Sequence, residues 1–168
     1  RLEAIRERID RAGATAEIRT LGPSGQGMGD LVGQADLVLV DAPCSGSGTW
    51  RRRPEAPWRL TPGTLGRFPP QQLAILSRAA DLVRPGGRLV YITCSVFAEE
   101  NEEVAAAFAT ARPEFHPRPI AEAAAVPALT QAGQRRLAEL AGGGHTVQLT
   151  PLRNGTDGFF VALFERSA

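Results

Sequence analysis

The chain of 168 residues contains no lysine, only two cysteines, and no apolar run as long as a membrane span. With no such run and no signal peptide at its start, we expect a cytoplasmic protein that does not associate with membranes. The cysteines lack the CxxC or Cys/His spacing of a zinc site, which also disfavours a thiol oxidoreductase. The sequence therefore predicts no bound metal and two free thiols, as is typical of a reducing compartment.

The absence of lysine makes all 19 basic residues arginine, against 18 acidic residues. A GC-rich genome explains this bias, because alanine, glycine and proline are abundant as well. Arginine also suits bidentate phosphate contacts and stacking on bases, so nucleic-acid binding is compatible with the same composition. The 43% hydrophobic and 22% charged fractions are typical of one globular domain, or of a piece of one.

The pattern of apolar residues predicts alternating helices and strands. Helices are expected over residues 1–12, 70–83, 98–111 and 134–141, and strands over 16–21, 36–40, 88–93, 115–120 and 159–165. Residues 45–70, rich in Gly, Pro and Arg, are predicted to form a long irregular loop. The apolar run 36–40 is typical of a strand buried on both faces, so the alternation predicts an α/β domain with a mostly parallel sheet.

Both cysteines follow hydrophobic strands directly. Cys44 comes after the apolar run Leu37–Val40, and Cys94 comes after the run Arg88–Ile92. In a parallel sheet the carboxyl ends of the strands face one common crevice, where ligands bind. The two thiols are therefore predicted to lie side by side in one site, which indicates thiolate chemistry.

Short motifs surround both cysteines. The segment Asp41–Gly48 is followed by Leu89–Ser95 and by Glu99–Glu102. Five shorter stretches support them: Arg51–Pro54, Trp58–Arg59, Gln72–Leu73, Arg84–Gly87 and Gly155–Phe160. With these motifs the chain resembles the RNA cytosine-C5 methyltransferases of the RsmB/NOP2/NSUN family, which use S-adenosylmethionine. The motifs cover most of the chain in the family's order.

This resemblance implies a Rossmann-like methyltransferase sheet whose last strand, Phe159–Glu165, is antiparallel. It also implies that residues 1–168 are the C-terminal portion of a single catalytic domain. The pattern of the first helix is already under way at Arg1, so we expect a piece of a longer protein. The N-terminal part of the fold, including the family's glycine-rich cofactor loop, is then expected upstream of this residue.

The resemblance further implies roles for three residues at the strand ends. Cys94 matches the nucleophile of the TCS motif, and Cys44 matches the second cysteine, which is associated with release of the methylated base. Asp41 matches the acidic residue near the reacting base and the methyl donor. Together with Pro43, it is expected to contact S-adenosylmethionine.

The chemistry explains why such residues are needed. Carbon-5 of cytosine is a poor nucleophile until a thiolate adds to carbon-6 and breaks the aromaticity of the ring. A group that holds the N3/N4 edge of the base must then stabilise developing charge, which suits Asp41. The target base must also leave its stack, so RNA contacts are expected nearby. The residues predicted to contact ribosomal or transfer RNA are Thr93, Ser45, Gly46, Arg51 and Arg59.

Each of these residues also has a plain structural interpretation. A buried cysteine is usually an inert small hydrophobe, Asp41 could cap a turn, and the arginines could form a solvated loop face. The acidic run Glu99–Glu103 is interpreted as a helix-dipole and solubility feature. Two functional alternatives stay open: a catalytically incomplete RNA-binding or interaction fragment, and a related methyltransferase acting on DNA or another nitrogenous substrate. A monomer is expected in either case.

Overall fold

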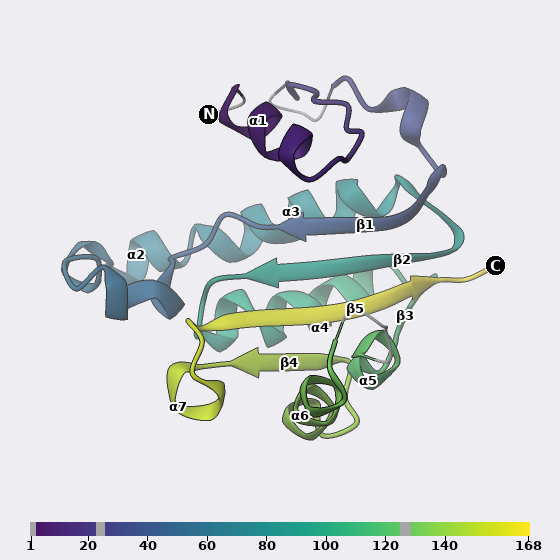
Figure 1. The fold of residues 1–168 in the computed structure, drawn as a ribbon. Coiled ribbons are helices and arrows are strands. Elements are labelled where there is room, and N and C mark those ends of the chain that lie inside the picture. Colours follow the sequence, from purple (N-terminus) through teal and green to yellow (C-terminus); the bar gives the residue numbers. More distant parts are fainter. Residues whose placement is uncertain (1–2, 23–25, 125–128) are drawn as a thin grey trace. The chain divides into compact units, whose positions relative to one another are not determined.

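The computed structural model describes residues 3–22, 26–124 and 129–168. The chain divides into two compact parts, Arg1–Leu31 and Val32–Ala168, and each is described by itself. Figure 1 shows the elements of both parts. All of the residues predicted to carry function belong to the second part.

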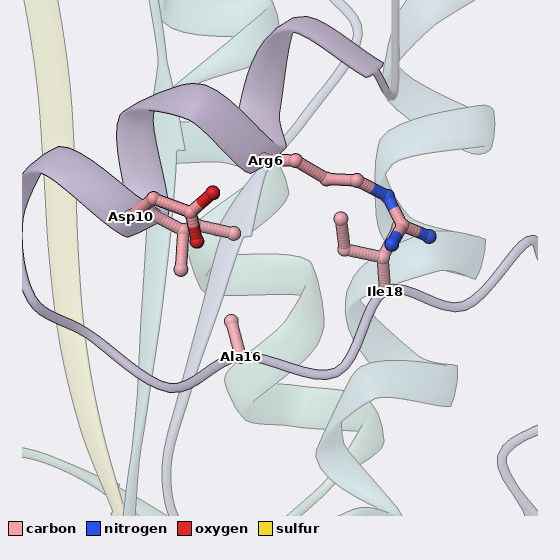
Figure 2. A pocket seen from close by; sticks show the side chains of 5 residues that line it. Arg6, Asp10, Ala16 and Ile18 are labelled. Atoms are coloured by element: carbon pink, nitrogen blue, oxygen red, sulfur yellow. The ribbon is translucent and has the colours of Figure 1, made fainter.

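The first part contains helix α1 (Glu3–Arg11) and a 3-10 turn, η1 (Gly29–Leu31). The predicted first helix is confirmed, whereas the strand predicted over residues 16–21 is wrong, because this segment has no strand pairing. The segment forms a loop instead, in which Arg19 makes ion pairs with Glu17 and Asp30. Figure 2 shows a small pocket between α1 and this loop, lined by Arg6, Ile9, Asp10, Ala16 and Ile18. No predicted site residue lines it.

The second part is built on one sheet with the strand order β1-β2-β5-β3, and β4 also pairs with β5. Its strands are β1 (Ala35–Asp41), β2 (Val83–Thr93), β3 (Phe115–Pro117), β4 (Thr146–Leu149) and β5 (Phe159–Arg166). Strands β1 and β2 are parallel, whereas β5 runs antiparallel to each strand it pairs with. The antiparallel last strand is therefore confirmed, and the sheet is mixed over the described residues.

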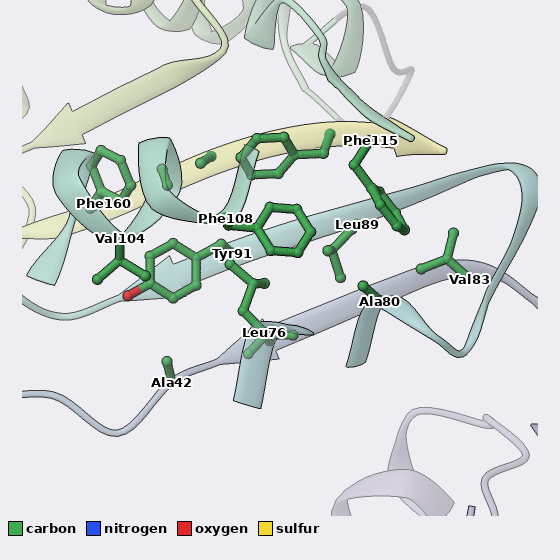
Figure 3. Packing of buried hydrophobic residues seen from close by; sticks show 14 residues of the cluster. Ala42, Leu76, Ala80, Val83, Leu89, Tyr91, Val104, Phe108, Phe115 and Phe160 are labelled. Atoms are coloured by element: carbon green, nitrogen blue, oxygen red, sulfur yellow. The ribbon is translucent and has the colours of Figure 1, made fainter. Parts of the chain in front are cut away.

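Helices cover the sheet on both faces. The helices of this part are α2 (Pro62–Leu65), α3 (Phe68–Ala80), α4 (Glu102–Ala111), α5 (Ile120–Ala124), α6 (Gln131–Ala141) and α7 (Pro151–Asn154). Of these, α3 and α4 pack on one face of the sheet, and α5 and α6 on the other. The larger core cluster joins α3 and α4 to one face of the sheet through Leu76, Tyr91, Phe108 and Phe160 (Figure 3). Leu163, which alternates with Phe160 and Phe164 along β5, belongs instead to the smaller cluster with α5, α6 and β4.

The predicted elements differ from the observed ones in several places. Strand β2 begins at Val83, which pairs with Ala35 ahead of a bulge, so it is longer than expected. Strand β4 was not predicted, and part of the alanine-rich segment, residues 125–128, lies outside the described residues. Leu37 and Leu39 of β1 are 57% and 58% exposed, so the expectation of burial on both faces is wrong. Among the strands of the described residues, β1 pairs with β2 alone.

The predicted irregular loop of residues 45–70 contains short turns. These are η2 (Ser47–Arg52), η3 (Pro57–Arg59) and the single-turn helix α2, after which α3 begins. Proline stands in the first turn of η3, α2 and α3, where its missing N–H costs no hydrogen bond. The segment leaves the carboxyl end of β1 and returns to the sheet through α3.

Candidate active site

Parallel pairing of β1 and β2 brings the two cysteines together, as predicted. Asp41, near the end of β1, is paired with Ile92, near the end of β2. The Sγ atoms of Cys44 and Cys94 then lie 3.2 Å apart, and both residues are free thiols of intermediate exposure. At this separation one thiol donates a hydrogen bond to the other sulfur.

This contact makes the two thiols unequal. The S–H of Cys44 lowers the pKa of Cys94 to about 7, against opposing effects from burial and from the carboxylates of Asp41 and Glu100. The pKa of Cys44 is raised, first by its hydrogen bond to Cys94 and then by burial. A single proton therefore stays on Cys44 near neutral pH, while a large fraction of Cys94 is thiolate.

The loop after Cys44 is fixed by close backbone contacts. Gly48 N donates to the carbonyl of Cys94 at 2.9 Å, and Gly158 N donates to the carbonyl of Gly48 at 2.8 Å. A Cβ atom on Gly48 would lie 2.1 Å from the carbonyl oxygen of Gly158. Gly46 adopts the left-handed conformation with φ 71° just before η2. Glycine is needed at positions 48 and 158 because the backbone of the segment Asp41–Gly48 touches that of the segment Gly155–Phe160.

Glu100 is a fully buried carboxylate, with 0% exposure. It lies between the two cysteine loops, which are residues 43–48 and 93–97. Its Oε2 accepts from the hydroxyls of Ser45 at 2.5 Å and Ser95 at 2.6 Å. Its Oε1 accepts from the backbone N–H of Ser45 at 2.8 Å and from Nε2 of Gln72 at 3.1 Å. The interpretation of this residue as part of an exposed helix-dipole feature is therefore wrong. Glu100 ends the 3-10 turn η4 (Ala98–Glu100), and the non-helical backbone of Asn101 separates it from α4, so helical spacing along α4 does not indicate its burial.

Asn101 holds the residues on both sides of Cys94. Its Oδ1 accepts from the Thr93 hydroxyl at 2.6 Å, and its Nδ2 donates to the Ser95 carbonyl at 3.0 Å. Thr93, which the sequence analysis assigned to RNA contact, is thus buried with its hydroxyl bonded inside the fold. Ser45, also predicted to contact RNA, is half-buried, and its hydroxyl donates to Glu100 inside the fold.

Asp41 and Pro43 are exposed at the carboxyl end of β1. The carbonyl of Pro43 accepts from Gln72 Nε2 at 3.0 Å. Among the described residues the Asp41 carboxylate has no hydrogen-bond donor, yet it lies near enough to Cys94 to oppose its ionisation. Asp41 thus places an accessible carboxylate beside the Cys94 thiol.

The basic segment (residues 51–68) presents two kinds of arginine. Arg51 and Arg52 form ion pairs with Asp157 and so tie the segment to the turn before β5. Arg59 is exposed beside Trp58, whose surface is 88% exposed. A shallow hollow beside the Cys44 loop is lined by Ser45, Arg53, Glu55, Ala56, Arg59, Leu60, Thr64 and Phe68. Its lining thus combines two arginines and one glutamate with three apolar side chains.

The described residues contain neither a metal-binding cluster nor a membrane-spanning helix. No group of three or more His, Cys, Asp or Glu side chains in them could hold a metal ion. None of the helices described here is long and apolar enough to cross a membrane.

Comparison with known proteins gives consistent matches over this chain. A family model for the 16S rRNA methyltransferase RsmB/F matches residues 1–165. A Bacillus subtilis protein named "Probable ribosomal RNA small subunit methyltransferase B" is 35% identical over 164 residues, which are 96% of this chain and 34% of that protein. A Thermus thermophilus protein named "Ribosomal RNA small subunit methyltransferase B" is 38% identical over 133 residues, covering 79% of this chain and 30% of that protein.

A solved structure is similar as well. The crystal structure of the protein PH0851 superposes with a TM-score of 0.79 and 33% identity, over 99% of this chain and 34% of that one. The chain therefore spans about a third of the length of the curated relatives and of the solved structure that it matches.

Proposed function

Because the chain belongs to the 16S rRNA methyltransferase RsmB/F family, we propose that it is the C-terminal portion of the catalytic domain of an RNA (cytosine-5) methyltransferase. The proposed substrate is small-subunit ribosomal RNA, methylated in the cytoplasm with S-adenosylmethionine as methyl donor. The observation that carries the chemistry is the 3.2 Å contact between Cys44 and Cys94, which provides a thiolate and a thiol at one point.

Cys94 is the proposed nucleophile. Its thiolate adds to carbon-6 of the cytosine, forming an S–C bond, and the electron pair of the carbon-5–carbon-6 bond moves so that carbon-5 becomes enamine-like. A pKa of about 7 makes thiolate available at neutral pH without loss of nucleophilicity, since very acidic thiols attack poorly. Asp41 is proposed to hold the N3/N4 edge of the ring and stabilise the charge that develops there.

Cys44 is the proposed releasing group, and the geometry supplies a reason for its timing. While Cys94 is a thiolate, the hydrogen bond between the sulfurs keeps the proton on Cys44. Once the Cys94 sulfur is a thioether, that cause of the raised pKa of Cys44 is gone. The thiol can then release its proton to solvent, and the resulting Cys44 thiolate removes the carbon-5 proton after methylation. The electron pair of the broken C–H bond reforms the carbon-5–carbon-6 double bond while the carbon-6–sulfur bond breaks and the Cys94 thiolate leaves.

When bound, S-adenosylmethionine supplies an electrophilic methyl group to carbon-5. Of this chain's residues, Asp41 and Pro43 are proposed to contact it, because both are exposed at the end of β1 beside Cys94. They would hold one edge of the cofactor and orient it toward the base.

RNA is proposed to lie over the basic segment. Exposed Trp58 provides a stacking face, while Arg59 and the hollow beside Ser45 provide cations for phosphates. The ion pairs of Arg51 with Asp157 leave this arginine 63% exposed, so it can still face a phosphate. Gly46 and Ser45 would line the entrance to the two thiols through their backbone, since the Ser45 hydroxyl is engaged by Glu100.

The proposal is tested by methyl transfer in the polypeptide that carries this chain. Radiolabelled S-adenosylmethionine should label small-subunit ribosomal RNA, and nuclease digestion should release the label as 5-methylcytidine. Transfer to DNA and not to RNA would reject the proposal in favour of a related DNA enzyme. RNA binding without cofactor binding in calorimetry, and without transfer, would identify a non-catalytic RNA-binding fragment.

A further inference from the structure

Glu100 has no part in the proposed reaction, although it is a fully buried carboxylate near both thiols. A carboxylate leaves water at high free-energy cost unless hydrogen bonds replace its hydration. Both oxygens of Glu100 are satisfied, each by two donors. A buried and satisfied carboxylate of this kind fixes the relative positions of its donors, because moving any one of them leaves charge unpaired.

The donors of Glu100 come from both cysteine loops. Ser45 directly follows Cys44, and Ser95 directly follows Cys94. One oxygen, Oε2, accepts both serine hydroxyls, at 2.5 and 2.6 Å. The two loops, fifty residues apart in the chain, are therefore tied together through a single atom.

The residues that precede the two cysteines, Pro43 and Thr93, are held by Gln72 and Asn101. Gln72 donates through the same Nε2 to Glu100 and to the carbonyl of Pro43, which precedes Cys44. Asn101, next to Glu100 in the chain, accepts from the Thr93 hydroxyl and donates to the Ser95 carbonyl. Each cysteine is thus fixed on both sides by this cluster.

We propose that Glu100 is a positioning residue, which holds the Cys44 thiol against the Cys94 thiol and thereby makes one of the two the attacking sulfur. Its catalytic meaning rests on the proposed function, whereas the positioning itself concerns the two thiols alone. The hydrogen bonds of the two serines to Oε2 set the separation of the loops, and the 3.2 Å contact of the sulfurs follows from it.

Glu99 provides a matched control. It precedes Glu100 in the 3-10 turn η4 (Ala98–Glu100), carries the same side chain, and is exposed. Substitution of Glu99 changes the net charge as much as substitution of Glu100 does, but leaves both serines in place.

The test compares the alkylation rates of the two thiols. The protein is alkylated with iodoacetamide at pH 7, and the labelling rates of Cys94 and Cys44 are obtained separately by peptide mass spectrometry. In the unmodified protein Cys94 should react on the order of tenfold faster than Cys44. Glu100→Ala should lower this ratio at least fivefold, toward equal rates, whereas Glu99→Ala should leave it unchanged. Loss of the Glu100 charge alone would act in the opposite direction: the charge raises the pKa of Cys94, so its removal would raise the ratio, and a fall cannot come from the charge.

Glu100→Gln is the conservative variant. Its amide keeps an oxygen for Ser45 N and Gln72, and its NH₂ can donate to the two serine hydroxyls once they rotate. The ratio should stay within about twofold of the unmodified protein. A ratio in Glu100→Gln as low as in Glu100→Ala would overturn the proposal, as would an unchanged ratio in Glu100→Ala.

Two further measurements keep the outcome clear. If Glu100→Ala does not fold, as judged by circular dichroism, Ser45→Ala removes one of the four hydrogen bonds and should lower the ratio about two- to threefold; an unchanged ratio there contradicts the proposal. In a methyl transfer assay, Glu100→Ala should lower kcat while the KM for RNA stays constant. Because the labelling ratio needs neither RNA nor cofactor, its failure is distinguishable from failure of the proposed function.

Discussion

The cysteine loops (residues 43–48 and 93–97) and the basic segment (residues 51–68) adjoin in the structure and are held by opposite means. The cysteine loops are joined by a buried carboxylate and by a backbone hydrogen bond from Gly48 to Cys94, and Gly48 is packed directly against Gly158 of the turn before β5. The basic segment consists of short turns whose charged side chains are exposed. Rigid geometry is what thiol chemistry needs, whereas an exposed cationic surface is what a large anionic substrate needs.

The difference also separates the effects that mutations should have. Changes in the cysteine loops should alter chemistry or folding, and changes in the basic segment should alter RNA affinity. Five substitutions, in order of decreasing expected effect, test this division.

Cys94→Ala should abolish methyl transfer, by more than about a thousandfold, because the thiolate that activates carbon-5 is lost. Initial rates with saturating RNA measure this effect. RNA affinity should be unchanged, since the basic segment is intact. A variant that retains a tenth of the activity would show that Cys94 is not the nucleophile.

Gly48→Ala should destabilise the fold by about 2–3 kcal/mol, because the new Cβ would lie 2.1 Å from the carbonyl oxygen of Gly158. The free energy of unfolding is measured in urea. Gly63→Ala is the matched control in the basic segment, since a Cβ there meets nothing within 4 Å. Equal stability of the two variants would contradict the close contact between the backbones.

Cys44→Ala should raise the pKa of Cys94 from about 7 toward the ordinary thiol value of about 8.5, because the S–H donor is removed. The thiolate fraction of Cys94 at pH 7 then falls from about one half to a few per cent, so alkylation should slow by roughly fifteenfold. At pH 10 the Cys94 thiol is almost fully ionised in both the unmodified protein and the variant, so its alkylation rate should be the same in the two. The check is the pH dependence of iodoacetamide labelling, and an unmoved midpoint would refute the thiol pairing.

Trp58→Ala and Arg59→Ala should each weaken RNA binding by roughly three- to tenfold, through loss of a stacking face or of a phosphate contact. The Arg59 variant should also show a smaller dependence of affinity on salt. Arg135→Ala, an exposed arginine on α6, is the control. Fluorescence anisotropy with a labelled RNA measures both effects, and the labelling ratio of the two cysteines should not change in either variant.

The two regions also differ in how far the sequence predicted them. The cysteine pair was predictable because two apolar runs indicated parallel strands, and the carboxyl ends of such strands meet. Glu100 was not, because a carboxylate is buried only where tertiary structure supplies donors, here from residues up to fifty-five positions away. The strand expected over 16–21 failed for the related reason that a strand needs a neighbouring strand, which the apolar pattern does not provide. For the basic segment, the pairing of Arg52 with Asp157 was not predictable, because the two residues are 105 positions apart in the chain.

The proposed roles of Cys94 as the attacking group and Cys44 as the releasing group can be measured directly. The experiment uses Cys44→Ala with substrate RNA and S-adenosylmethionine, followed by denaturing electrophoresis. We expect a covalent RNA–protein adduct that accumulates in this variant, is linked through Cys94, and is absent from the Cys44→Ala, Cys94→Ala double variant. If no adduct forms under conditions in which the unmodified protein methylates the RNA, or if an adduct forms in the double variant, the assignment of the two thiols is contradicted.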